Sequence, residues 1–166
     1  MKQTVVTNRK AIFASILYGY ALSIATKKDT SIKIGLGVHS GDHEIYPDCR
    51  PEFYDALEHA FQVGNWDSEK VSFYLPYLEG DKETILMDAE KSLDKLNLDF
   101  DTIFANTNTS YNPDEQGRSS GKSGADIERI LAFNAIGRKD PVPYVEDWSK
   151  VLEHAIKIEK EHKEKI

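Results

Sequence analysis

The only cysteine of the chain lies in a short segment that is dense in chemically active side chains. In "YPDCR", residues 46–50, Cys49 stands between Asp48 and Arg50, directly before a predicted helix start at Pro51. A carboxylate accepts hydrogen bonds, a guanidinium pairs with anions, and a helix start adds backbone N–H donors. The segment therefore predicts a site for a polar planar or anionic ligand. The alternative is a solvated loop with a capping aspartate and a quiet, partly buried thiol.

Two other segments suggest chemistry less specifically. His39, Asp42 and His43 fall within five residues, and imidazole and carboxylate groups together suit a transition metal. Histidines are common in loops, so a polar loop is the simpler interpretation and we expect no metal. "GRSSGKSG" suggests a phosphate-binding loop, but only three residues separate Gly117 from Gly121, where that loop needs four. We therefore expect residues 112–124 to form a flexible polar loop.

The elements that position these residues follow from hydrophobic periodicity. Ile32, Ile34, Leu36 and Val38 alternate with other residues and predict a strand that ends just before the polar segment. Ligands of α/β proteins bind at the carboxyl ends of such strands. Further extended segments are expected at 3–6, 70–78 and within 101–112. Helices are expected at 10–26, 51–64, 81–96, 125–137 and within 144–166. This alternation predicts an α/β fold, with a partial parallel sheet and flanking helices.

Composition sets the protein class. The 166 residues, 40% of them hydrophobic, predict a single domain over residues 1–166 with a real core. A net charge of −7 argues against direct nucleic-acid binding, which needs clustered cations. The longest apolar run, residues 11–25, is shorter than the roughly 20 residues of a membrane span, and no signal segment opens the chain. One cysteine excludes an internal disulfide framework, so we expect a cytoplasmic protein.

Several segments together resemble one known family. "GVHSGDHEIYPDCRPEF" resembles the "GV…D…YPDCR…EF" signature of the 7-cyano-7-deazaguanine synthases of queuosine biosynthesis. "VTNRKAIF", residues 6–13, is similar to that family's "VPGRN…F", and "LPYLEGDKET" to a segment in which a strand leads to a Glu-Thr helix. "TNTSYN" resembles "TLTCYN", and Asp126 to Arg129 fall where the family has Cys-x-Leu-Arg. The likeness covers roughly residues 5 to 135.

The resemblance implies a function and a set of site residues. The family converts 7-carboxy-7-deazaguanine to the nitrile with ATP and ammonia, on an adenine nucleotide alpha hydrolase-like (PP-loop) fold. A carboxylate substrate suits an arginine, and the edge of a purine-like ring suits an aspartate as acceptor. The resemblance implies six residues that bind the substrate, its carboxylate or a phosphate: Tyr46, Asp48, Arg50, Asp42, Arg9 and Arg129.

Two departures from the family change what is expected. The "SGGxDS" loop that binds ATP in the family's amino-terminal half does not occur in this sequence, so ATP is expected only with a partner chain. That partner is an amino-terminal PP-loop subunit or, alternatively, a second copy in a homo-oligomer. Four zinc cysteines of the family are replaced by Ser110, Ser119 or Ser120, Ser123 and Asp126, which makes zinc unlikely by chemistry.

Three functional hypotheses follow. The first is a subunit of a split synthase that needs a partner for ATP binding. The second is a non-catalytic module that binds deazaguanine or another purine, or that regulates an interaction. The third is a structural or interaction protein with an empty pocket. The "YPDCR" segment, which suggests a pocket still in use, favours the first.

Overall fold

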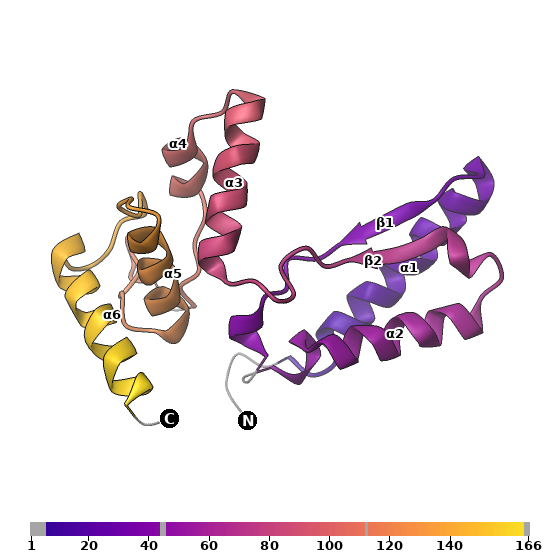
Figure 1. Ribbon diagram of the computed structural model, residues 1–166, viewed down its shortest axis with the longest axis horizontal. Coiled ribbons are helices and arrows are strands. Elements are labelled where there is room, and N and C mark those ends of the chain that lie inside the picture. Colours follow the sequence, from indigo (N-terminus) through magenta and orange to yellow (C-terminus); the bar gives the residue numbers. More distant parts are fainter. Residues whose placement is uncertain (1–5, 44–45, 112, 165–166) are drawn as a thin grey trace. The chain divides into compact units, whose positions relative to one another are not determined.

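The chain divides into two compact units. The computed structural model describes residues 6–43, 46–111 and 113–164, and its contacts gather within Met1–Asp81 and within Lys82–Ile166. We call these unit 1 and unit 2 and describe each separately (Figure 1). The sequence predicts one domain over residues 1–166, and whether the two units fold cooperatively as one stays a prediction.

Unit 1 is a small α/β structure. Its main elements are α1 (Arg9–Lys28), β1 (Ile32–Gly35), α2 (Pro51–Gly64) and β2 (Val71–Tyr74). The two strands are parallel, with Ile32 opposite Val71 and Gly35 opposite Tyr74. Because parallel strands need a crossover connection, α2 lies between them in the chain. The predicted α/β class with a partial parallel sheet is confirmed in this unit, although each strand has only four residues.

The core of unit 1 lies between α1, α2 and one face of the sheet (Figure 1). Side chains alternate along a strand, so Ile34, Val71 and Phe73 face the helices while Lys33 faces away. The Tyr18 ring of α1 stacks on the Phe61 ring of α2, with centroids 4.4 Å apart. The two helices therefore pack on each other and on the same face of the sheet.

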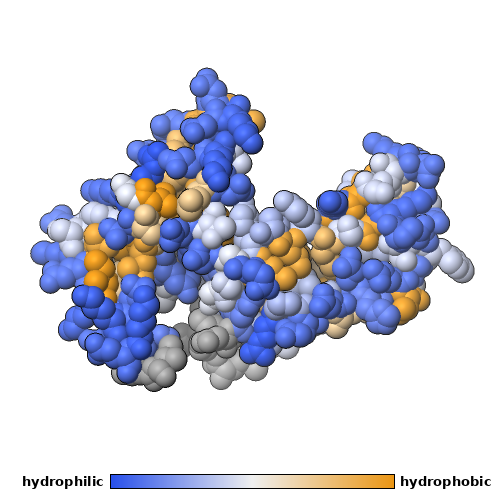
Figure 2. All heavy atoms as spheres, in the orientation of Figure 1, coloured by the Kyte–Doolittle hydropathy of each residue, from blue (hydrophilic) through white to orange (hydrophobic). Residues whose placement is uncertain are grey.

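Unit 2 is helical over the residues that the structure describes. It contains α3 (Lys82–Leu96), α4 (Phe100–Ala105), α5 (Gly124–Ala135) and α6 (Trp148–Lys163). Leu86, Leu93, Phe100 and Phe133 form one buried cluster, and Ile130 joins α6 in another. Figure 2 shows hydrophobic patches on both units amid hydrophilic residues.

Several expected boundaries differ from the structure. The strand predicted within 101–112 is wrong over the described residues, because α4 covers the stretch up to Ala105 and residues 106–111 form no strand. The Asp99 side chain accepts a hydrogen bond from the Thr102 backbone N–H and caps that helix, while Phe100 and Phe104 lie one turn apart and pack together. The carboxyl-terminal helix begins at Trp148 and not at residue 144. The extended segment predicted at 3–6 lies outside the described residues except Val6.

The polar loop predicted at 112–124 carries hydrogen bonds of its own. The Asp114 carboxylate accepts from the Arg118 side chain, and Ser119 pairs with the 143–145 segment in an isolated bridge. Its flexibility stays a prediction. None of the described helices is long and apolar enough to cross a membrane.

Candidate functional site

The site predicted in unit 1 lies at the carboxyl ends of its two strands. After β1 the chain turns through a short 3-10 helix, Ser40–Asp42, and after β2 it reaches Gly80. The backbone N–H and the hydroxyl of Ser40 both donate to the carbonyl of Gly80, at 2.8 and 2.6 Å. These bonds join the segments that follow the two strands, so the polar loop after β1 is anchored to the segment after β2.

The "YPDCR" segment forms a second 3-10 turn, Pro47–Cys49, which leads directly into α2. The Tyr46 backbone N–H donates to the Asp42 carbonyl at 2.8 Å, and the Cys49 N–H donates to the Tyr46 carbonyl at 2.9 Å. Pro51 then starts α2, because its fixed φ suits a first helical position and its missing N–H costs nothing there. The first of these bonds joins the two 3-10 turns, so the backbones of Asp42 and Tyr46 meet beside Asp48, and their binding of a ligand stays a prediction.

The Cys49 thiol is enclosed. The residue is completely buried and packs with Val38 and Tyr54. Burial raises the pKa of the thiol, and the neighbouring Lys10 ammonium opposes part of this rise. A buried thiol with a raised pKa is a poor nucleophile, which favours an unreactive, structural thiol over a catalytic one.

Lys10, in the first turn of α1, is a member of this cluster that the sequence analysis missed. Its ammonium donates a hydrogen bond to the Cys49 sulfur and lies 3.6 Å from the Asp48 carboxylate. It also lies 6.0 Å from the centroid of the Tyr46 ring. Its position beside Arg9, in the segment that resembles "VPGRN", is the one signal in the sequence that points to it. We call Lys10, Tyr46, Asp48 and Cys49 the Lys10 cluster.

The remaining predicted residues of unit 1 lie around this cluster. Arg50 is exposed, and its Nε donates to the His43 carbonyl at 2.7 Å. The His39 Nε2 lies 3.6 Å from the Asp42 carboxylate. Arg9 is exposed at the first residue of α1. Within the described residues, no three His, Cys, Asp or Glu side chains are placed to share a metal ion.

Arg129 lies in unit 2, where its guanidinium is already used. It is buried and binds the Asp140 carboxylate through Nε at 2.6 Å and Nη2 at 2.9 Å. Its Nη1 donates to the Thr107 hydroxyl at 2.9 Å. This use of its donors favours a structural role over the predicted contact with substrate or phosphate.

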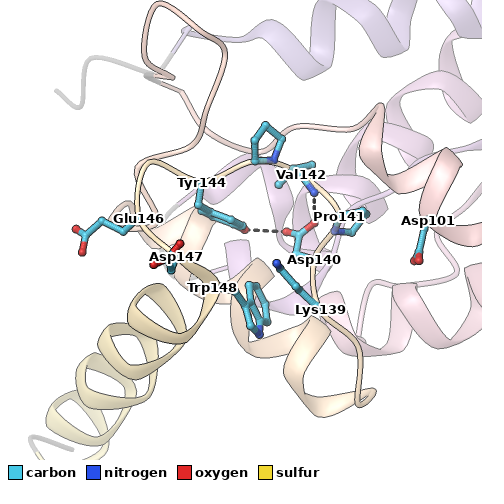
Figure 3. A pocket seen from close by; sticks show the side chains of 10 residues that line it. Asp101, Lys139, Asp140, Pro141, Val142, Tyr144, Glu146, Asp147 and Trp148 are labelled. Atoms are coloured by element: carbon cyan, nitrogen blue, oxygen red, sulfur yellow. Dashed lines mark hydrogen bonds between the residues drawn. The ribbon is translucent and has the colours of Figure 1, made fainter.

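A pocket of about 450 Å³ lies beside the Asp140 side chain in unit 2 (Figure 3). The Tyr144 hydroxyl donates to Asp140 at 2.7 Å, and the Val142 backbone N–H donates at 3.2 Å. Burial raises the pKa of Tyr144, and the negative charge of Asp140 adds to the rise. Since Arg129, Tyr144 and Val142 occupy the carboxylate, Asp140 stabilises the pocket wall and is not available to a ligand.

Comparison with known proteins identifies the family. Residues 1–137 match the model of a family described as "Queuosine biosynthesis protein QueC". The chain belongs to this family. It is 42% identical over 144 residues to the 7-cyano-7-deazaguanine synthase of Psychromonas ingrahamii, and these residues make up 87% of this chain and 58% of the relative. It is 38% identical over 152 residues to the synthase of Caldicellulosiruptor saccharolyticus, covering 90% of this chain and 60% of the relative.

The chain matches only part of each relative. The chain spans about three fifths of the length of the curated synthases that it matches. No solved structure matches it significantly. Membership of the QueC family implies an adenine nucleotide alpha hydrolase-like fold, and the α/β architecture of unit 1 agrees with such a fold.

Three of the positions that resemble the family's zinc cysteines, Ser120, Ser123 and Asp126, form a hydrogen-bonded cluster. The Ser120 hydroxyl donates to the Asp126 carboxylate at 3.1 Å, and the Asp126 backbone N–H donates to the Ser123 hydroxyl at 3.1 Å. Ser123 and Asp126 together cap the start of α5. Ser119 donates to the Asn108 side chain instead, at 3.2 Å. One carboxylate and several neutral hydroxyls do not fit zinc, which takes thiolate, imidazole and carboxylate ligands.

Proposed function

We propose that this chain is the substrate-binding part of a 7-cyano-7-deazaguanine synthase, and that a partner polypeptide binds the ATP on which the family depends. The Lys10 cluster is the observation that supports this proposal. It brings Lys10 together with Tyr46, Asp48 and Cys49 of "YPDCR" beyond the carboxyl ends of two parallel strands, where α/β proteins bind ligands.

Each residue of the site has a role suited to 7-carboxy-7-deazaguanine. The Asp48 carboxylate accepts hydrogen bonds from N–H groups on the edge of the ring, and the Tyr46 ring offers an apolar face. Arg50 is exposed and donates to the His43 carbonyl through Nε, so its terminal nitrogens can bind the carboxylate of the substrate. Arg9, at the start of α1, adds positive charge next to Lys10.

No step of carboxylate activation is assigned to this chain. The "SGGxDS" motif does not occur in its 166 residues, and the described residues that resemble the rest of the family do not replace it. The chain therefore binds and orients the substrate, while the ATP chemistry belongs to the partner. This division is the reason for proposing a split enzyme.

Calorimetry with the purified chain tests the binding site. We expect 7-carboxy-7-deazaguanine to bind, and Asp48→Asn to weaken binding at least about tenfold, the size of a lost charged hydrogen bond. Asp55→Asn, an exposed position on α2, is the matched control and should leave binding unchanged. Equal binding by the chain and by Asp48→Asn would overturn the site assignment, and failure of every deazaguanine to bind would favour a structural protein.

A second candidate function is a non-catalytic deazaguanine-binding module. The use of Arg129 in a buried ion pair favours it, because one of the six predicted ligand residues is then not available to substrate or phosphate. Turnover separates the two candidates. ATP-dependent nitrile formation by the chain together with an ATP-binding partner supports the split enzyme, whereas ligand binding without turnover supports the module.

A further inference from the structure

Helix α1 exposes large apolar side chains on the side that faces away from unit 1, where a helix that only covers a sheet normally has polar residues. The residues that it buries against the rest of unit 1 are mostly small: Ala14, Tyr18, Ala21 and Ala25. The residues that it leaves between 44% and 67% exposed are large: Ile12, Phe13, Ile16, Leu17 and Tyr20. Alanines let the helix approach the sheet closely, but they leave the larger hydrophobic side chains in water.

The exposed residues form one continuous surface. Ile12, Ile16 and Tyr20 are spaced four apart, and Phe13 and Leu17 form the adjacent row, so all five lie on one side of the helix. We call these five residues the α1 stripe. No charged residue occurs from Ala11 to Thr26, although a helix that faces water normally carries a charged side there. A contiguous apolar surface of this kind marks an interaction site.

We propose that the α1 stripe docks the folded polypeptide that supplies the part of the synthase missing from the match. This inference rests on the proposed function. The matched residues cover 58% of the relative from Psychromonas ingrahamii. The remaining 42% of that relative is long enough to form a folded part that packs on the stripe. Each strand of the described two-stranded sheet also has one edge without a neighbouring strand, so the sheet can take further strands.

The chemistry of the stripe favours that partner over a second copy of the chain. Each copy carries a net charge of −7, so two copies repel each other at long range. In the relatives, the matched and unmatched parts belong to one polypeptide. The proposed partner therefore presents an apolar surface of its own, such as a helix or the face of a sheet.

Co-expression tests this docking without any ligand. The chain is produced with the segment of the Psychromonas ingrahamii synthase that lies outside the match, and the purified material is measured by analytical ultracentrifugation. We expect a complex with one copy of each polypeptide. Ile16→Asp, at a position that is 67% exposed, should weaken it at least about tenfold, because an apolar contact is replaced by a buried charge.

Val63→Asp is the matched control, since Val63 is 71% exposed on α2 and lies outside the stripe. Phe13→Ser is a second stripe variant that introduces no charge, and circular dichroism checks that each variant is folded. Three results would overturn the proposal: no complex, a complex that Ile16→Asp and Phe13→Ser leave unchanged, or self-association of the chain that these variants abolish. The last result would assign the stripe to a second copy. Because no deazaguanine is present, failure here is distinct from failure of the calorimetry.

Discussion

Each unit contains a cation–carboxylate pair, and the two pairs differ in burial and in the number of bonds that they make. In unit 2, Arg129 and Asp140 are 7% and 0% exposed in their side chains, and two short hydrogen bonds join them. In unit 1, Lys10 and Asp48 are 27% and 32% exposed and lie 3.6 Å apart. Loss of one partner from a buried pair leaves an uncompensated charge and destabilises the fold, whereas an exposed pair contributes little to stability and its atoms stay accessible. The comparison favours a structural role for the first pair and leaves the second accessible to the ligand proposed for it.

Removing Arg129 should have the largest effect. Arg129→Ala leaves the Asp140 carboxylate buried without its cation, so the free energy of unfolding should fall by about 3–5 kcal/mol. Urea denaturation followed by circular dichroism measures this loss. Arg118→Gln breaks the partly exposed pair with Asp114 and should cost less than about 1 kcal/mol. Equal losses from the two variants would remove the distinction between a structural pair and a surface pair.

Tyr54, which is buried beside Cys49 of the Lys10 cluster, should affect the stability of the protein at alkaline pH. Burial raises the pKa of Tyr54 from 10.0 to about 12, and the nearby Cys49 and Asp48 add to the rise. A raised pKa means that the folded state holds the neutral phenol, so this stability is complete below pH 10 and is lost as the pH rises toward about 12. Tyr54→Phe should therefore reduce the fall in melting temperature across that range. Tyr74→Phe, at a 52% exposed position, is the control and should leave the fall unchanged.

Ser123 tests the hydrogen-bonded cluster that stands where the family has zinc cysteines. Ser123→Ala removes the cap of α5 and should lower the free energy of unfolding by about 1 kcal/mol. Ser92→Ala, at an exposed position inside α3, removes a hydroxyl without a capping role and should not destabilise. A chelator should leave the melting temperature unchanged. A clear drop would show that a metal holds this loop after all.

Lys10 should have the smallest effect on stability and a separate effect on binding. Lys10→Met should change the free energy of unfolding by less than about 1 kcal/mol, because the pair with Asp48 is partly exposed. Calorimetry with 7-carboxy-7-deazaguanine should nevertheless show weaker binding, since a positive charge beside an anionic ligand is lost. A large loss of stability with unchanged binding would make the Lys10 cluster structural, like the Arg129 pair.

Local signals in the sequence predicted much of the secondary structure. Pro51 and Glu52 indicated the start of α2, and α2 begins at Pro51. The periodicity of residues 81–96 predicted α3 to within one residue. The misread stretch, 101–112, contains β-branched and aromatic residues that suit a strand, but the Asp99 cap and the packing of Phe100 on Phe133 make its first part helical.

The candidate site was predictable only in part. Asp42, Tyr46 and Asp48 are close in the chain and belong to two neighbouring 3-10 turns and their caps, so the sequence was sufficient to group them. Lys10 is 39 residues away from Cys49, and no local rule joins them. Arg129 matched a family position, but its partner Asp140 could not be recognised from spacing alone.

The sequence by itself determined the family and the start of α2 after "YPDCR", because these depend on neighbouring residues and short-range hydrogen bonds. Only the tertiary structure decided which cation each carboxylate meets and which side of α1 stays in water. Those outcomes depend on packing between elements that are distant along the chain, where burial sets the cost of every unpaired charge and every exposed apolar side chain.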